Sequence, residues 1–329
     1  MGTQLFLLTT NDAPRLKLVT MDIAAAHPVI VNVVPEQDAV LSGAWLVGGR
    51  LLLSYQVDAT IQINRHTLDG KADGVVKLPG MGTAVGFEGG NDDKETFFGF
   101  TSYNVPGIIY RYDVAKNTAL VWSEAKIDID LKKITVERRF YQSKDGTRIP
   151  MFIVRRKDVT GPAPGLLCAY GGWAISEPPA FSSERLAWVE HGGVFAIAHI
   201  RGGGEHGKAW HDAGRRKNKQ NVFDDFIAAG EYLKAQGITP KDGLAIQGAS
   251  NGGLLIGAAV NLRPDLFAAA LRQVGVMDML RFDKFTAGKL GRRIWRSRKR
   301  KRFPQPSGLS SVSQYKTGQG LSGNPCDHG

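Results

Sequence analysis

The feature that most restricts the fold is a glycine-flanked serine, Gly248-Ala249-Ser250-Asn251-Gly252, placed between two apolar segments. Residues 243–247 before it have the pattern of a strand, and residues 252–262 after it have that of a helix. A G-x-S-x-G pattern often arises by chance, but in this context it is typical of a nucleophile elbow. The elbow predicts Ser250 as a nucleophile and the backbone N–H of Asn251 as a donor to a developing oxyanion. A purely structural glycine-rich turn is the alternative.

The first part of the chain has the pattern of short strands separated by turns. Groups of apolar and β-branched residues begin near positions 5, 51 and 97, a period of about 46 residues. Strand groups that repeat with such a period are typical of β-propeller blades, so we predict about three blades. The pattern leaves an unrelated β-sandwich open as the alternative.

The pattern changes after about residue 130. A hairpin is expected over residues 135–154, and strand and helix signals alternate after it. Apolar runs at 165–170 and 193–198 suit buried strands, whereas residues 222–236 carry apolar side chains at helical spacing. This alternation predicts a mostly parallel sheet with helices on both faces.

The net charge of +11 is concentrated at the C-terminal end. Residues 289–329 hold ten Lys or Arg against one acid, whereas positions 1–288 hold 32 basic and 30 acidic residues. Nothing in this last segment can bury a core, so we predict it to be disordered. The predicted organisation is a partial β-propeller over 1–130, a partial α/β-hydrolase domain over 131–288 and a basic tail over 289–329.

Two further glycine-rich loops follow buried strands. Tyr170-Gly171-Gly172-Trp173 stands where an α/β hydrolase supplies its second oxyanion donor, so the Tyr170 phenol could donate and Trp173 could pack against a substrate. An aromatic pair that closes a core is the alternative. The cluster at residues 201–205 suggests a phosphate-binding loop, but no helix with Gly-Lys-Ser/Thr follows it, which argues against nucleotide binding.

Several other function classes find little support. Cys168 and Cys326 fit neither a disulfide framework nor a metal site, and no metal or other cofactor is predicted. No signal peptide is visible, and no apolar run reaches the roughly 20 residues of a membrane helix, so we expect a cytoplasmic protein with no membrane partner. Residues 289–302 include nine basic residues in fourteen, which leaves salt-dependent nucleic-acid binding as a minor alternative.

A series of motifs, in order along the chain, resembles the prolyl oligopeptidase family of serine peptidases. The resemblance extends over residues 1–288. Its motifs are Tyr170-Gly171-Gly172-Trp173, Ala198-His199-Ile200-Arg201-Gly202-Gly203-Gly204-Glu205, Asn221-Val222-Phe223-Asp224-Asp225-Phe226, Gly248-Ala249-Ser250-Asn251-Gly252-Gly253-Leu254-Leu255, Arg263-Pro264-Asp265-Leu266-Phe267 and Gln273-Val274-Gly275-Val276-Met277-Asp278-Met279-Leu280.

The resemblance implies a seven-bladed β-propeller that caps an α/β-hydrolase domain in a monomeric enzyme. It implies hydrolysis of short peptides on the C-terminal side of proline, with the propeller excluding large folded substrates. Carried over by position, Ser250 is the nucleophile, and Tyr170 and the amide of Asn251 are the oxyanion donors. Trp173 and Val276 are expected to line the proline pocket.

The chain departs from the family's pattern at the other two members of the catalytic triad. Hydrolases of this fold present them in the order serine, acid, histidine, but His328 is the only histidine after Ser250 and lies in the basic tail. We therefore identify no triad histidine and no triad aspartate. The acids that follow the serine are Asp265, Asp278, Asp283 and Asp327.

Two further departures concern completeness. Three blades are predicted where the family has seven. The resemblance stops abruptly after residue 288, which favours a shifted reading frame or a retained intron over gradual divergence. Because loss of a triad member costs on the order of 10⁴ to 10⁶ in kcat, we predict that this chain alone is nearly or wholly inactive. A non-catalytic remnant that binds peptides or a partner is the alternative.

Overall fold

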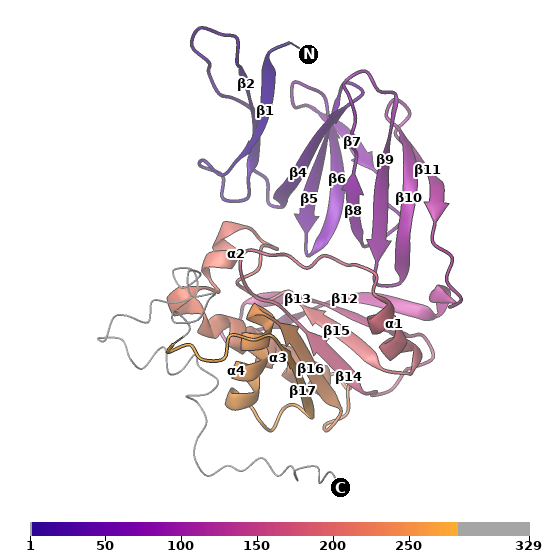
Figure 1. Cartoon of the computed structure of the whole chain (residues 1–329), viewed down its shortest axis with the longest axis vertical. Helices are drawn as coiled ribbons and strands as arrows, with labels where there is room; N and C mark the ends of the chain where they lie inside the picture. Colours follow the sequence, from indigo (N-terminus) through magenta and orange to yellow (C-terminus); the bar gives the residue numbers. More distant parts are fainter. Residues whose placement is uncertain (1, 282–329) are drawn as a thin grey trace.

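The computed structural model describes residues 2–281. The predicted basic tail at 289–329, with Asp327 and His328, lies outside the described residues, as does Asp283. Figure 1 shows two regions, a set of antiparallel sheets from the first part of the chain and a mixed sheet flanked by helices below them. The predicted fold class, a partial propeller followed by a partial α/β hydrolase, is confirmed.

The first part of the chain forms three antiparallel sheets, each from strands that are consecutive in the sequence. The first contains β1 (Gln4–Thr9), β2 (Lys17–Asp22) and β3 (Val31–Val34). The second contains β4 (Val40–Val47), β5 (Arg50–Val57), β6 (Thr60–His66) and β7 (Ala72–Val76). The third contains β8 (Thr83–Gly86), β9 (Glu95–Ser102), β10 (Val105–Asp113) and β11 (Thr118–Glu124).

Apolar side chains fill the spaces between successive sheets. Leu18 and Tyr55 share one buried cluster between the first sheet and the second. Between the second and third, Leu52 lies in a cluster with Phe98, whose ring stacks on Phe87 at a centroid distance of 4.7 Å. Because the sheets pack in chain order, each on the next, they are arranged as propeller blades and not as the two-sheet sandwich that the sequence leaves open.

After a 3-10 helix (Leu131–Lys133), the chain builds a six-stranded sheet in the order β12-β13-β15-β14-β16-β17. Strands β14 to β17 pair in parallel, whereas β12 and β13 form an antiparallel hairpin at one end. The sheet is therefore mixed, with its parallel part next to the serine motif. The strands are β12 (Ile134–Gln142), β13 (Arg148–Arg156), β14 (Gly165–Cys168), β15 (Val194–Ala198), β16 (Leu244–Ala249) and β17 (Ala269–Gln273).

Helices cover both faces of this sheet, as the alternating pattern predicts. Leu186 of α1 packs on one face, and α3 and α4 cover the other, where Phe226 and Leu233 are buried at helical spacing. The helices are α1 (Ser183–Glu190), α2 (Lys208–Asp212), a 3-10 turn (Arg216–Asn218), α3 (Gln220–Ala235) and α4 (Asn251–Leu262).

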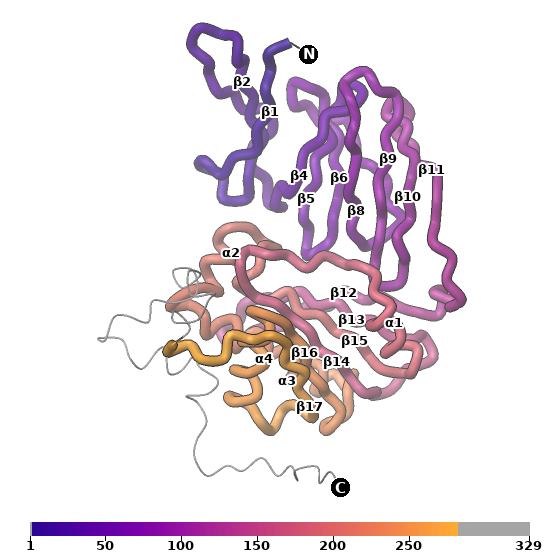
Figure 2. Tube along the Cα trace, viewed as in Figure 1, coloured from indigo at the N-terminus to yellow at the C-terminus, as the bar shows by residue number. Residues whose placement is uncertain are grey.

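The blades and the mixed sheet share part of one core. Tyr103 from the third blade lies in a buried cluster with Phe152 and Phe195 of the mixed sheet, and its ring centroid is 5.4 Å from that of Phe152. The Thr83 hydroxyl donates a hydrogen bond to the carbonyl of Pro179 at 2.7 Å. Figure 2 follows the chain from β11 into β12 at this junction.

Strand β17 is one of several elements that the sequence pattern does not predict, with β3, β4, β8, α1 and α2. Its five residues, Ala269–Gln273, show no alternation, and all of them are exposed. The exposure follows from the position of β17 at the edge of the sheet, where β16 is its pairing partner. No helix within residues 2–281 is long and apolar enough to cross a membrane.

Candidate active site

Ser250 sits on a sharp turn between β16 and α4. Its backbone angles are φ 56° and ψ −116°, a positive-φ conformation that is costly for any residue other than glycine. The flanking glycines are required by close contacts, since a Cβ on Gly248 would lie 2.6 Å from the carbonyl oxygen of Gly252. A Cβ on Gly252 would lie 2.9 Å from the carbonyl oxygen of Ala169. The motif therefore adopts the strained elbow that the sequence predicts, and Ser250 is exposed at its tip.

The elbow is attached to its neighbours through backbone groups. The N–H of Ser250 donates to the carbonyl of Gln273 on β17 at 3.0 Å, and its own carbonyl accepts from the N–H of Leu254 at 3.1 Å. Asn251 is the first residue of α4, so its N–H is one of the unpaired donors at the positive end of the helix dipole. This is the position from which an oxyanion can be stabilised.

The loop that carries Tyr170 is joined to the elbow by a side chain. The Asn251 amide nitrogen donates to the carbonyl of Tyr170 at 2.6 Å, and the Asn251 side chain is buried. The backbones pack closely here, since a Cβ on Gly172 would lie 2.5 Å from the same amide nitrogen. Tyr170 and the N–H of Asn251, the two predicted oxyanion donors, therefore belong to segments in direct contact.

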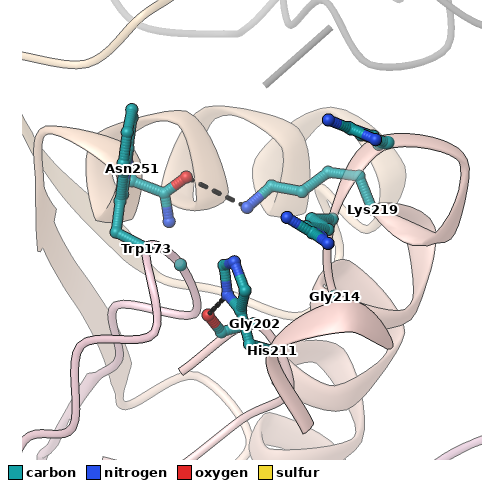
Figure 3. Close-up of a pocket in the computed structure, with 9 residues that line it drawn as sticks. Trp173, Gly202, His211, Gly214, Lys219 and Asn251 are labelled. Carbon is teal, nitrogen blue, oxygen red and sulfur yellow. Dashed lines mark hydrogen bonds between the residues drawn. The ribbon is translucent and has the colours of Figure 1, made fainter. Parts of the chain in front are cut away.

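A buried lysine is the third partner in this contact. Lys219 donates through Nζ to the carbonyl of Gly171 and to Oδ1 of Asn251, each at 3.0 Å (Figure 3). Burial lowers the pKa of Lys219 to about 7 from its ordinary value of 10.5. Our sequence reasoning did not identify Lys219, because nothing in the local sequence indicates that its amino group is buried.

Trp173, predicted to line the proline pocket, is half-buried at the end of the Tyr170 loop. It has a φ of 61° and lines a small cavity of about 30 Å³ together with Asn251 and His211. Figure 3 shows these three side chains around the cavity. Val276 is half-buried against the core that includes α4, and its neighbour Gly275 contacts the backbone of Gly253. The two predicted pocket residues thus lie on segments that contact the start of α4.

Ser250 also borders a larger open pocket, of about 630 Å³, on the α1 side of the sheet. Tyr170 and Gln273 line it together with Glu177 and Arg185. Burial raises the pKa of Glu177, so this carboxyl binds a proton more readily than usual. The pocket has room for part of a peptide beside the elbow.

The structure brings no histidine to this pocket among the residues it describes. His211 has its Nδ1 2.8 Å from the carbonyl oxygen of Gly202, on the other side of the Tyr170 loop. His199, which directly follows β15, is buried with Nδ1 3.6 Å from Oε1 of Glu205. Neither occupies a position where it could take a proton from Ser250.

The two described acids that follow the serine are engaged in surface ion pairs. Asp265 pairs with Arg263 at 2.8 Å, beyond the C-terminal end of α4 and therefore roughly 18 Å along the helix from the elbow. Asp278 pairs with Arg281 at 2.6 Å. Within residues 2–281 the structure therefore presents a serine elbow and the Tyr170 loop, with neither a histidine nor one of the acids that follow the serine in the pocket that Ser250 borders.

The glycine cluster at residues 201–205 packs against the Tyr170 loop. Arg201 pairs with the fully buried Asp225 at 2.5 Å and with Asp145, also at 2.5 Å. A Cβ on Gly202 would lie 2.5 Å from the carbonyl oxygen of Gly171, so this loop packs directly beneath the Tyr170 loop. No group of three His, Cys, Asp or Glu side chains with metal-binding geometry occurs among the described residues.

Two family models match the chain. The N-terminal β-propeller domain of prolyl oligopeptidase matches residues 1–125, and the prolyl oligopeptidase family matches residues 179–319, past the point where the quoted motifs end. Prolyl endopeptidase of Elizabethkingia miricola is 44% identical over 293 residues, which make up 87% of this chain and 41% of that protein. The chain therefore spans about two fifths of the length of this curated relative.

Solved structures agree with these matches. One prolyl endopeptidase, from a study of inter-domain dynamics, superposes with a TM-score of 0.84 at 47% identity. The superposition covers 97% of this chain and 47% of the prolyl endopeptidase chain. Prolyl oligopeptidase B of Galerina marginata, solved with a 25mer macrocyclization substrate, gives a TM-score of 0.90 at 32% identity, over 97% of this chain and 45% of its own.

Propeller blades joined to an α/β-hydrolase sheet with a serine elbow define a class of serine peptidases. Together with both family models, they show that this chain belongs to the prolyl oligopeptidase family.

Proposed function

We propose that this chain is part of an oligopeptidase that hydrolyses short peptides on the C-terminal side of proline. Ser250 attacks the scissile carbonyl, the Tyr170 phenol and the N–H of Asn251 stabilise the oxyanion, and Trp173 and Val276 line the pocket for the proline ring. The observation that carries the proposal is the strained Ser250 turn at the start of α4, in direct contact with the Tyr170 loop.

The same geometry supports a second proposal, that this chain alone has little or no peptidase activity. Ser250 needs a general base to become a nucleophile at neutral pH, and no described histidine lies in its pocket. The only histidine after it in the sequence is His328. A missing base leaves the contributions of the oxyanion hole and of binding, with a loss on the order of 10⁴ to 10⁶ in kcat.

A fluorophosphonate probe tests both proposals, because it phosphonylates an activated serine beside an oxyanion hole. We expect slow labelling of Ser250 by the purified chain, acceleration by added imidazole as a substitute base, and no labelling of Ser250→Ala. Mass spectrometry of the peptide that contains the elbow locates the label. Equal labelling of Ser250→Ala would contradict the assignment of the nucleophile. Cleavage of a Gly-Pro reporter substrate at ordinary enzymatic rates would contradict the inactivity of the chain.

A further inference from the structure

Lys219 lies on neither of the segments that carry the proposed catalytic groups. It precedes α3, directly after the 3-10 turn Arg216–Asn218, and its side chain extends between the Tyr170 loop and the start of α4 (Figure 3). The residue is 4% exposed. Its Nζ spans the two segments with hydrogen bonds to Gly171 and Asn251, both 3.0 Å long.

The lysine also determines which way the Asn251 amide faces. An ammonium group only donates, so the amide must present Oδ1 to Nζ and leave its nitrogen for the carbonyl of Tyr170, 2.6 Å away. With the amide reversed, two donors would face each other at Nζ and two acceptors would face each other at Tyr170. The lysine therefore stabilises the hydrogen bond from Asn251 to Tyr170 as well as its own hydrogen bond to Asn251.

The two hydrogen bonds of Lys219 Nζ, to Gly171 and to Asn251, form a bridge between the Tyr170 loop and α4. The packing around this bridge leaves the loop little freedom of movement. A Cβ on Gly171 would lie 2.6 Å from the side chain of Val222, and one on Gly172 would lie 2.5 Å from the Asn251 amide. The Tyr170 loop is thus packed tightly against side chains of α3 and α4, so a change in the bridge must move the loop.

Burial of an ammonium group at this position has a high free-energy cost. Its desolvation costs several kcal/mol, and an apolar side chain of similar volume usually packs there at lower cost. A cation kept at this position therefore points to a task beyond packing.

We propose that Lys219 is a positioning residue that sets the distance and orientation between the Tyr170 loop and the N-terminus of α4. Since Tyr170 and the N–H of Asn251 are the oxyanion donors of the proposed function, this inference rests on that function. Lys219 does not touch the reacting atoms. It acts through the two segments that do.

The charge on Lys219 gives the bridge a pH dependence. Hydrogen bonds from a charged donor are roughly twice as strong as neutral ones, and a neutral amine can also accept, so it no longer selects the orientation of the amide. With burial lowering the pKa of Lys219 to about 7, the bridge weakens as the pH rises through neutrality. The other ionisable groups that line the cavity are His211, Arg215 and Arg216, and Arg215 pairs with Asp212.

The test follows the Asn251 side-chain amide by NMR in protein labelled with ¹⁵N-asparagine, where the resonance is the one absent from Asn251→Ala. We expect an inflection near pH 7 in the wild-type protein and its loss in Lys219→Met. Lys217→Met is the matched control, because Lys217 is the exposed lysine of the preceding 3-10 turn. His211→Gln separates the lysine from the neighbouring imidazole and should keep the inflection.

The second readout is the rate at which the fluorophosphonate labels Ser250 in the presence of imidazole. We expect a loss of about tenfold in Lys219→Met, smaller than the 10²–10³ for removal of an oxyanion donor itself, and no change in Lys217→Met. A wild-type amide that does not titrate, an inflection lost in His211→Gln, or labelling of Lys219→Met at the wild-type rate would each overturn the inference. If Lys219→Met does not fold, the wild-type and His211→Gln titrations decide.

The two readouts also separate this inference from the proposed function. If the wild-type chain is not labelled at Ser250 even with added imidazole, the proposed function is contradicted. An inflection of the Asn251 amide resonance that depends on Lys219 would still support the positioning role of Lys219. The absence of that inflection would overturn it.

Discussion

The N–H of Ser250 donates a hydrogen bond to the carbonyl of Gln273 at 3.0 Å, and this bond ties the tip of the elbow to the edge strand of the sheet. β17 therefore does more than extend the sheet. It holds the strained residue from the side opposite the Tyr170 loop, so a displacement of β17 is transmitted to the serine.

The contact between α4 and the segment after β17 can be tested by adding one methyl group. A Cβ on Gly253 would lie 2.5 Å from the carbonyl oxygen of Gln273 and 2.7 Å from the Cα of Gly275, both backbone atoms that cannot rotate away. We expect Gly253→Ala to lower the free energy of unfolding by about 2 kcal/mol or more, measured by urea denaturation. Gly161→Ala is the control, because a Cβ there meets no atom within 4 Å. Equal stability of the two variants would contradict the packing described here.

A second prediction concerns the buried ion pair beneath the Tyr170 loop. Arg201→Met leaves Asp225 buried without its cation, so we expect a loss of about 3–5 kcal/mol in unfolding free energy. Arg263→Met removes a cation whose partners, Glu231 and Asp265, are exposed, and should cost about 0–1 kcal/mol. The comparison is made by urea denaturation near neutral pH. A loss in Arg201→Met no larger than in Arg263→Met would show that the buried network contributes little.

The third prediction concerns pH and stability. The folded protein releases the Lys219 proton near pH 7, whereas an unfolded lysine keeps it until about 10.5, so between these values the unfolded state binds more protons. The contribution of Lys219 to the free energy of unfolding therefore rises across this range and is constant below it. Urea denaturation at about pH 6, 8 and 9 should show stability increasing in the wild type relative to Lys219→Met. Parallel curves would contradict the lowered pKa.

This rise in overall stability accompanies the weakening of the local bridge. Loss of the proton removes the cost of burying a charge and, at the same time, the charged hydrogen bonds to Gly171 and Asn251. The two effects are therefore separable by experiment, since one is seen in global unfolding and the other in the Asn251 amide.

The fourth prediction concerns the exposed edge of the sheet. Among the described residues, β17 has a strand partner on one side only, and the side chain of Leu271 is exposed, a combination that promotes pairing between chains. Leu271→Lys should reduce aggregation, measured as static light scattering during incubation at micromolar concentration. Val29→Lys adds the same charge at an exposed loop position outside the strands and should have a smaller effect. Similar scattering from both variants would show that the edge is not the site of association.

The elbow could be predicted from sequence because its requirements are local. Gly248 and Gly252 are needed by contacts within a few residues of Ser250 or with one neighbouring strand, and apolar runs on either side indicate the strand and the helix. The blades could be predicted in part for a similar reason, since strands consecutive in sequence pair with one another. The period of about 46 residues nevertheless missed β4 and β8, the strands that open the second and third sheets.

The remaining features depend on contacts that no local pattern records. Lys219 bonds to residues 48 and 32 positions away in the chain, and a lysine in a polar segment is ordinarily expected in solvent. β17 shows no alternation in burial, since all five of its residues are exposed at the edge of the sheet within the described residues. The roles of Arg201 and Asp225 become visible only once the two loops are packed together.

The cluster shared by Tyr103, Phe152 and Phe195 has a consequence for how the molecule melts. Apolar surface buried between two regions favours their simultaneous unfolding, because either region alone would expose its half of the contact to water. Calorimetry should therefore record the blades and the hydrolase sheet as one cooperative transition, and protease protection should be lost from both together.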